Sequence, residues 1–285
     1  MGDHLKGLVI TTLGILLLVP DSLFVKVIEA EPMVTAFWRA LTAGVFVFLA
    51  LLLIRGLQDF RAVLRTGWPG LIYTVLIATT APAFVLAVAN TSVANVVFIL
   101  ATMPIFAAVF SRIFLDEPIR ARMVLTMVAV ILGLAIIVYG SSSTQTASWK
   151  GDIWAGYVSA AMAAALTALR TVKATSMIPA IPIAFIGAAI VIGLFVSPAE
   201  PFETQWPLFL GHGAFIAAAS CLLALGPRYI SASEVSLLFL LEAVLAPLLV
   251  WAVIGENPGS WALAGGAVVI GALLVSNLYA LANQK

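Results

Sequence analysis

The sequence predicts an all-α integral membrane protein with ten transmembrane helices, arranged as two inverted five-helix repeats around a central cavity. Its 285 residues are 63% hydrophobic and 9% charged, whereas ordinary globular domains have about 45–50% and about 25%. A spanning helix needs about 20 mostly apolar residues, so ten spans would use roughly 200 residues. The remainder leaves no room for a soluble domain, and a polar segment divides the apolar runs into two groups of five.

The expected spans are apolar runs bounded by charged residues, proline, glycine or polar clusters. They lie at 5–24, 33–54, 68–89, 93–115, 121–140, 151–170, 180–196, 206–226, 233–254 and 260–282. The first run is too long for the apolar core of a signal peptide, and no small-residue cleavage site follows it, so we expect a retained span. The single cysteine, Cys221, excludes an internal disulfide and a cysteine-based metal cluster.

The polar stretch Ser-Ser-Ser-Thr-Gln-Thr-Ala-Ser-Trp-Lys at 141–150 is typical of a surface linker. It separates a first five-helix repeat, residues 1–140, from a second, residues 151–285. The basic residues predict the orientation. With a cytoplasmic N-terminus, the inner segments carry Lys6, Arg55, Arg61, Arg65, Arg112, Arg120, Arg122, Arg170, Lys173, Arg228 and Lys285, and the outer segments carry Lys26 and Lys150. Eleven against two follows the positive-inside rule, so both termini should be cytoplasmic.

An odd number of spans in each half requires that the second half lie upside down relative to the first. Residues 90–117 align with residues 229–256 at an offset of 139. The identical pairs are Ser92 and Ser231, Val96 and Val235, Ala107 and Ala246, and Glu117 and Glu256. Together with the two groups of five spans, this alignment favours an inverted-topology repeat, which is typical of secondary transporters.

Several short motifs follow one another in the order of a known family. They are Phe37-Trp-Arg39, Pro104, Leu115-Asp-Glu-Pro118 followed by Gly133, Leu241-Glu242, and Ile254-Gly-Glu256 followed by Gly265, Gly266 and Gly271. Over essentially its whole length the chain resembles the drug/metabolite transporter superfamily, specifically its EamA-type members. It departs from their pattern where Val19-Pro-Asp21 replaces an early Trp-Gly, and where the proline that often follows the ninth-span glutamate is displaced to Pro247.

This resemblance implies two five-helix repeats, transport activity, and a place in the cytoplasmic membrane of a bacterium. The chain as a whole looks most similar to the YddG group, whose members export aromatic and other neutral amino acids. No cofactor is implied.

Glu242 is the one charged residue between Leu237 and Leu249, in the ninth apolar run. A central carboxylate costs about 2.5–3.5 kcal/mol on insertion, and the thirteen Leu, Val, Ile and Phe residues from Val235 to Ile254 return roughly 4–8 kcal/mol. The helix can therefore insert, and Glu242 needs a separate explanation. Pro247 leaves the carbonyl of Ala243 unpaired, and a protonated Glu242 or a water could satisfy it. The alternatives for Glu242 are therefore a proton acceptor, a partner for a substrate amine, or a member of an interhelical hydrogen bond.

The other intramembrane polar residues also have alternative roles. Arg39 could bind a substrate carboxylate, extend to the outer surface, or pair with Asp21. Asn95 lies at a tight outer turn with Asn90 and Thr91, where capping is the simpler explanation, although Asn95 could reach the cavity mouth. For His212, packing or hydrogen bonding is favoured over a proton relay, and with two histidines in the chain no metal site is expected.

Apolar and helix-breaking residues complete the predicted site. Phe98, Met103 and Tyr157 could line an apolar pocket, although each taken singly is more often core or lipid-facing. Kinks are expected at Pro20, Pro82, Pro104 and Pro247. Close helix contacts are expected at Gly44, Gly133, Gly187 and Gly271. Lys26, Glu29 and Glu31 should form a solvated outer loop.

The predicted function is export of small neutral or zwitterionic metabolites, such as aromatic and other neutral amino acids, by alternating access. Phosphorylated substrates would need several buried cations, and only Arg39 is available. No Walker motif is present, so neither ATP nor an ATPase partner is expected, and nothing indicates nucleic-acid binding. Export of other small organic solutes or drugs is the alternative. An enzyme is disfavoured because no catalytic motif is present, and a channel because no re-entrant selectivity segment is visible.

Overall fold

The computed structural model describes residues 3–56, 58–116, 121–143, 148–172, 175–230 and 232–282, which form helices and no strand. The helices are α1 (Asp3–Leu18), α2 (Asp21–Val27), α3 (Pro32–Arg55), α4 (Gln58–Leu64), α5 (Trp68–Asn90), α6 (Val93–Leu100), α7 (Met103–Leu115), α8 (Ala121–Ser143), α9 (Trp149–Thr171), α10 (Ala180–Gly193), α11 (Ala199–Leu225), the 3₁₀ turn η1 (Gly226–Arg228), α12 (Ala232–Ile254) and α13 (Ser260–Ala282). The predicted all-α class is confirmed for these residues.

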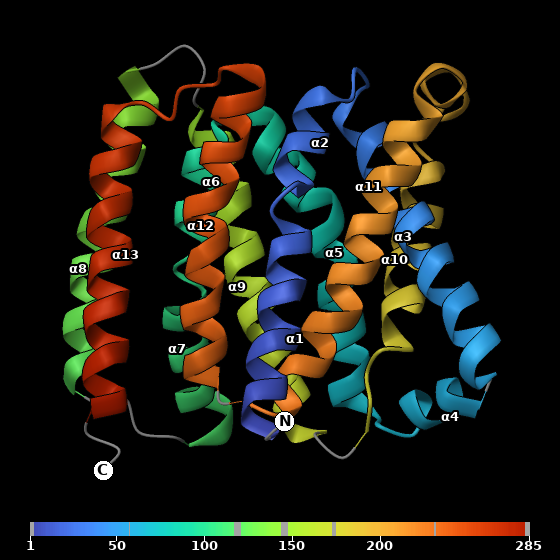
Figure 1. Cartoon of the computed structure of the whole chain (residues 1–285), viewed down its shortest axis with the longest axis horizontal. Coiled ribbons are helices and arrows are strands. Elements are labelled where there is room, and N and C mark those ends of the chain that lie inside the picture. The colour runs from blue at the N-terminus through green and yellow to red at the C-terminus, as the bar shows by residue number, and fades with distance from the viewer. Residues whose placement is uncertain are drawn as a thin grey trace.

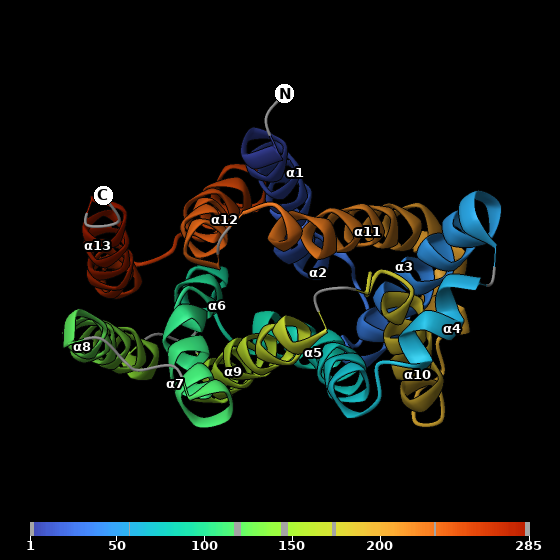
Figure 2. The ribbon, with the colours of Figure 1, turned by 90° about the horizontal axis from the view of Figure 1, so that it is seen from below.

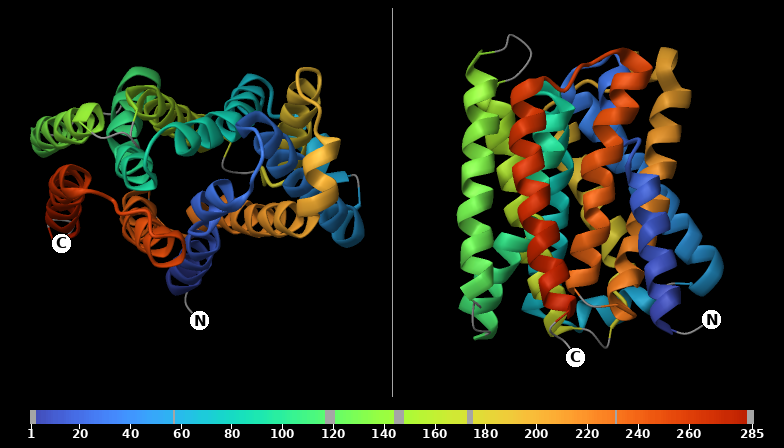
Figure 3. Two further views of the ribbon diagram at one scale, coloured as in Figure 1. Left: turned by 90° about the horizontal axis from the view of Figure 1, so that it is seen from above. Right: turned by 60° about the vertical axis from the view of Figure 1, so that its left-hand side comes forward.

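The long helices run side by side (Figure 1). Seen along their axes, α13, α12, α1 and α11 form one row, and α8, α7, α9 and α5 form the other (Figure 2). The pair α8 and α13 closes one end of the two rows, and α3 with α10 closes the other. Helix α1 begins and helix α13 ends on the same side, which we call the terminal side; the other is the opposite side (Figures 1 and 3).

Six helical segments are long and apolar enough to cross a membrane. They are His4–Val27, Pro32–Ile54, Trp68–Asn90, Val93–Phe114, Trp149–Thr171 and Ala199–Leu225. Shorter apolar helices lie at Val124–Gly140, Ala180–Gly193, Leu238–Ile254 and Ser260–Ser276. A multi-pass membrane protein follows from these segments, while the count of ten crossings remains a prediction.

The contacts between helices repeat when the two halves are exchanged. The contact of α5 with α9 corresponds to the contact of α11 with α1. Three further contacts each join a helix to its counterpart in the other half: α3 with α10, α6 with α12, and α8 with α13. Helix α1 starts on the terminal side, whereas α9 starts on the opposite side (Figure 1). The arrangement has the form that an inverted repeat would produce. The aligned residues Glu117 and Ser231 lie outside the described residues.

The four predicted proline kinks differ in kind. Pro82 and Pro247 lie inside α5 and α12, as expected. At Pro20 and Pro104 the span does not merely bend, because the helix is interrupted at each. Pro20 precedes the first residue of α2, and Pro104 lies in the first turn of α7, a position that needs no intrahelical hydrogen bond from the proline nitrogen.

One carbonyl freed by proline has a partner from another helix. Pro104 cannot donate to the carbonyl of Leu100, which instead accepts from the Ser159 hydroxyl on α9 at 3.5 Å. The Ser159 hydroxyl also lies 3.2 Å from that of Thr102. The break between α6 and α7 is thus compensated by polar side chains rather than left open.

Two features were not predicted. Helix α4 is a short surface helix between α3 and α5, and α11 contains a non-helical residue, Gln205 (φ −121°, ψ 19°), two residues before Pro207. Gln205 is also held by two hydrogen bonds of 2.9 Å to the backbone of Glu29. Glu29 is exposed and lies in a loop, as expected, while its backbone is tied to α11.

Candidate substrate site

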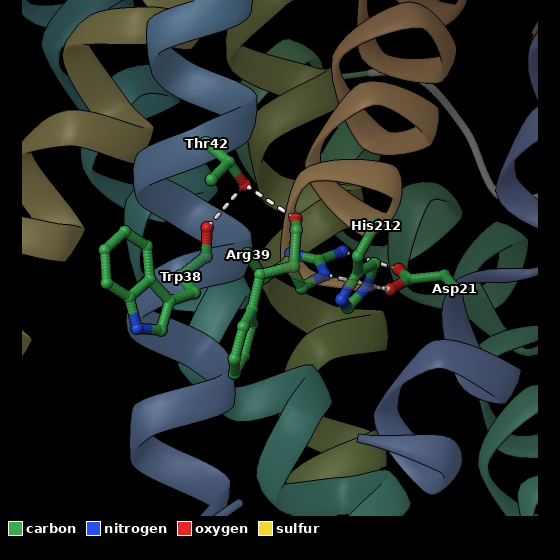
Figure 4. Close-up of polar contacts among 6 residues, drawn as sticks. Asp21, Trp38, Arg39, Thr42 and His212 are labelled. Carbon is green, nitrogen blue, oxygen red and sulfur yellow. Dashed lines mark hydrogen bonds and ion pairs between the residues drawn. The ribbon is translucent and has the colours of Figure 1, made fainter. Parts of the chain in front are cut away.

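A buried ion pair joins α2 to α3. Asp21 and Arg39 are 1% and 7% exposed. The Arg39 Nε and Nη2 groups donate to the Asp21 Oδ1 and Oδ2 atoms at 2.9 and 2.6 Å (Figure 4). Two parallel hydrogen bonds to one carboxylate fix both the distance and the plane of the guanidinium. Of the alternatives for Arg39, pairing with Asp21 is the one observed.

His212 of α11 adds a third group to the same carboxylate. Its Nε2 atom lies 2.6 Å from Asp21 Oδ1, and the ring stacks on Phe24 with a centroid distance of 5.1 Å. Because a carboxylate paired with arginine only accepts hydrogen bonds, Nε2 must carry a proton. His212 is fully buried, and its Nδ1 atom has no hydrogen-bond partner among the described residues. The expectation of a packed, hydrogen-bonded histidine matches this geometry.

The backbone around this triad of Asp21, Arg39 and His212 is held closely. Pro20 ends the preceding helix, so Asp21 occupies the first turn of α2. One helical turn from Arg39, the Thr42 hydroxyl donates to the carbonyls of Trp38 at 2.5 Å and Phe209 at 3.3 Å (Figure 4). A Cβ atom at Gly213 would lie 2.9 Å from the backbone nitrogen of Ala43. Only glycine permits this approach of α11 to α3, which brings His212 to Asp21.

Arg39 has hydrogen-bonding capacity left. The two bonds to Asp21 use Nε and Nη2, and the Nη1 group donates to no described residue. Nη1 is not fully buried either, so a ligand can reach it. The guanidinium carbon lies 5.4 Å from the centre of the Phe84 ring, which gives the cation an aromatic face. One positively polarised edge of Arg39 is thus free to bind a further anion.

Glu242 of α12 is 8% exposed and accepts no hydrogen bond from a described residue. It lies within electrostatic range of both Asp21 and Arg39. Because Asp21 already pairs with Arg39, an ionised Glu242 would add a second negative charge to this buried site. All four polar residues were candidates from the sequence, and pairing of Arg39 with Asp21 was one of the predicted alternatives. The approach of His212 and Glu242 to this pair was not predicted.

Asn95 belongs to a second polar group on the opposite side. The Asn95 side-chain amide donates to Thr91 Oγ1 and to Asp152 Oδ1, both at 3.3 Å, and Thr91 donates to the same oxygen at 2.9 Å. Capping by Asn95 is not observed, since the Ser92 side chain caps α6 by accepting from the Asn95 backbone at 3.2 Å. Asp152 was not among the candidates from the sequence, because a carboxylate in the first turn of a helix is ordinarily a surface group.

Lys26 forms an ion pair with Glu256 on the same side, which we call the Lys26–Glu256 clasp. Its Nζ atom lies 3.0 Å from Glu256 Oε2 and donates to the carbonyl of Thr91 at 3.2 Å. The other Glu256 oxygen accepts from the backbone of Val93 at 2.8 Å. The expectation that Lys26 lies in a solvated loop is therefore wrong. The Lys26–Glu256 clasp joins α2, the turn between α5 and α6, and the segment after α12.

The apolar candidates occupy different environments. Phe98 is buried in the core, where a Cβ atom on Gly266 would come within 2.5 Å of its ring. Met103 is also buried, whereas Tyr157 is 39% exposed and donates to Thr79 Oγ1 at 2.7 Å. Phe98 is thus explained by helix packing, and a pocket role for the other two stays a prediction. In the described part of the chain, no group of His, Cys, Asp and Glu could hold a metal ion.

Buried charges within apolar helices define a multi-pass membrane protein with an internal polar site. The chain belongs to the EamA-like transporter family, whose model matches residues 5–139 and residues 149–278. The predicted resemblance to EamA-type members is confirmed, and the chain is a membrane transporter of small solutes. One crystal structure is similar with a TM-score of 0.70 and 18% sequence identity, over 99% of this chain and 100% of its own; at this identity it supports the fold alone. No curated protein matches.

Proposed function

We propose that the protein exports small zwitterionic metabolites, among them aromatic and other neutral amino acids, by alternating access. The observation that carries this proposal is that Arg39 Nη1 and the Glu242 carboxyl group both lack a hydrogen-bond partner among the described residues. A zwitterion presents a carboxylate to the first and an ammonium group to the second. Low charge elsewhere in the spans disfavours multiply charged substrates.

The same site would change its access by movement between the two halves. Asp21 and Arg39 belong to the first half and His212 and Glu242 to the second, so relative rotation alters the site and its access together. The Lys26–Glu256 clasp would hold the opposite side shut in the present arrangement.

We further propose that the terminal side faces the cytoplasm of a bacterium. Lys6, Arg61, Arg65, Arg112 and Arg170 lie near helix ends on that side, and Lys26 and Lys150 near helix ends on the other. Such asymmetry follows the positive-inside rule. Protease protection of tags at either terminus in sealed inverted vesicles would test it: cleavage of both tags is expected, and protection of both would reverse the orientation.

A counterflow assay with purified protein in liposomes tests the substrate class. Liposomes loaded with unlabelled phenylalanine, leucine, a sugar or a nucleoside would be mixed with labelled phenylalanine. We expect transient accumulation of label only with amino-acid loading. If no amino acid accelerates exchange, the amino-acid proposal is wrong.

A second candidate substrate class follows from the charge balance. Because Asp21 neutralises Arg39, a solute with an ammonium group and no carboxylate would also compensate Glu242. Export of small organic amines is therefore the alternative, and amine-loaded liposomes in the same assay distinguish it. Uptake that does not saturate with concentration would instead indicate a channel.

Glu242 is also our candidate for proton coupling, because it can compensate its charge by taking up either a proton or the substrate ammonium group. We expect Glu242→Gln to abolish any dependence of exchange on a pH gradient without loss of folded protein, since Glu242 makes no hydrogen bond to a described residue that glutamine would break. Unchanged dependence on the pH gradient would place the proton site elsewhere. Loss of folded protein would favour a packing role.

A further inference from the structure

A groove on the terminal side lies between α4, the first turns of α5, and α10. Its volume is about 390 Å³, within the range of about 300–1,000 Å³ that is usual for small-molecule pockets. The lining is Val63, Leu64, Gly67, Trp68, Gly70, Leu71, Thr74 and Ile183. Thr74, its one hydroxyl residue, donates to the carbonyl of Gly70 at 2.7 Å. The groove therefore presents an apolar wall with its polar side chain already satisfied.

The groove is open toward the surface that spanning helices present to lipid. Trp68 and Leu71 are 76% and 51% exposed, and the exposed residues Ile72 and Val75 continue the same apolar strip along α5. In a helix of 23 residues that is long enough to cross a membrane, such a strip contacts acyl chains. A tryptophan at the end of a spanning helix is typical of the membrane interface. An acyl chain can thus enter the groove from the bilayer.

Two arginines, Arg61 in α4 and Arg65 directly after it, flank the lining residues Val63 and Leu64 in the chain. The backbone nitrogen of Arg65 donates to the carbonyl of Arg61 at 3.3 Å, so one helical turn places both side chains on one face, beside Leu64. Both arginines are exposed. Asp59, the acidic residue of α4, interacts with a group other than these two arginines, so it does not occupy them.

Helix α4 is anchored, which keeps these charges in place. Val63 is 5% exposed and packs in a core cluster with Tyr73 and Met177. The Phe60 ring lies 5.7 Å from that of Phe48 on α3. The helix therefore has a buried face toward the bundle and a basic face toward the membrane surface, as interfacial amphipathic helices do.

We infer that the groove formed by α4, α5 and α10 is a binding site for an anionic phospholipid, with an acyl chain against Trp68 and Leu71 and the phosphate between Arg61 and Arg65. Neutral lipid would enter the groove with its chain but would gain less from the arginines. A single arginine near an anionic lipid surface contributes roughly fivefold in affinity, so two give a preference on the order of 25-fold. The site is independent of the transported substrate.

Fluorescence quenching by brominated lipids tests this inference on the full-length protein in neutral detergent. Brominated acyl chains of phosphatidylglycerol or phosphatidylcholine would be titrated against the wild type and Trp68→Phe, and the difference isolates the signal of Trp68 among seven tryptophans. We expect half-maximal quenching of Trp68 at a concentration of phosphatidylglycerol on the order of 25-fold lower than that of phosphatidylcholine.

Charge variants identify the headgroup contact. The double variant Arg61→Gln/Arg65→Gln should bring the ratio between the two lipids close to one while Trp68 is still quenched. Arg112→Gln is the matched control, because Arg112 is an exposed arginine of α7 that pairs with Asp116 at 3.6 Å, away from the groove; it should keep the wild-type ratio. Equal quenching of the wild type by both lipids, or a preference that survives the double variant, would overturn the inference. If the double variant does not fold, the wild-type ratio decides alone.

Discussion

The guanidinium of Arg39 on α3 and the carboxylate of Asp21 on α2 form a two-point ion pair inside the apolar bundle, with contacts of 2.9 and 2.6 Å. The pair leaves Arg39 Nη1 free while it fixes the rest of the guanidinium. Asp21 therefore acts as a positioning residue for Arg39. His212 in turn holds Asp21 from the other half of the chain.

Loss of the Asp21 charge should destabilise the protein strongly. Asp21→Asn leaves Arg39 buried without a counter-charge, and breaking a buried pair from one side costs about 3–5 kcal/mol. Asp21→Asn/Arg39→Gln removes both charges and should recover part of the loss. Thermal unfolding of the purified variants in detergent measures this; a double variant no more stable than Asp21→Asn would contradict an ion pair as the cause.

Variants of His212 separate its stacking from its hydrogen bond. His212→Phe keeps an aromatic ring against Phe24 and loses the bond to Asp21, a loss of about 1.5–3 kcal/mol for a charged acceptor. His212→Ala also leaves a cavity and should cost more. The melting temperature should fall in the order wild type, His212→Phe, His212→Ala. Equal melting temperatures for the two variants would contradict a packing contribution.

The Lys26–Glu256 clasp should limit opening on the opposite side. Both side chains are about one-fifth exposed, so Lys26→Gln should change stability by about 1 kcal/mol or less and raise the exchange rate in counterflow several-fold. The reversal Lys26→Glu/Glu256→Lys restores opposite charges but cannot donate to the Thr91 carbonyl or accept from the Val93 backbone. It should therefore restore the wild-type rate only in part. An exchange rate that Lys26→Gln leaves unchanged would show that the clasp does not limit opening.

Close packing of α8 on α13 depends on Gly133 and Gly265. A Cβ atom on Gly133 would lie 2.9 Å from the Gly265 carbonyl oxygen, and one on Gly265 would lie 2.6 Å from the Gly133 oxygen. Gly133→Ala should therefore cost about 1–3 kcal/mol. Gly271→Ala is the control in α13, because a Cβ atom there meets nothing within 4 Å. A melting temperature lowered equally by both changes would refute the packing argument.

These contacts show what the sequence could predict. Long apolar runs and basic residues at their ends are local signals, and they gave the helical class and most helix positions correctly. Close approach at Gly133 and Gly44 was predicted correctly, but Gly187 and Gly271 face open space. A glycine marks a possible contact, while the partner helix decides whether it is used.

Polar partners across the bundle were harder to predict. Asp21 and His212 are 191 residues apart, and no local pattern joins them. Lys26 and Asp152 resemble ordinary loop and helix-start residues until the fold brings Glu256 and Asn95 beside them. Their tertiary partners, rather than their residue types, distinguish the observed network from a solvated surface.

The most direct test of the zwitterion site is counterflow with three compounds of one shape. Liposomes loaded with phenylalanine, with phenethylamine, which lacks the carboxylate, or with phenylpropionate, which lacks the ammonium group, would be compared for accumulation of labelled phenylalanine. We expect phenylalanine to support exchange and each one-ended compound to support it at least about tenfold less, since the loss of one charged hydrogen bond is worth about 1.5–3 kcal/mol. Exchange with phenylpropionate equal to that with phenylalanine would contradict recognition of the ammonium group by Glu242. Equal exchange with phenethylamine would contradict recognition of the carboxylate by Arg39.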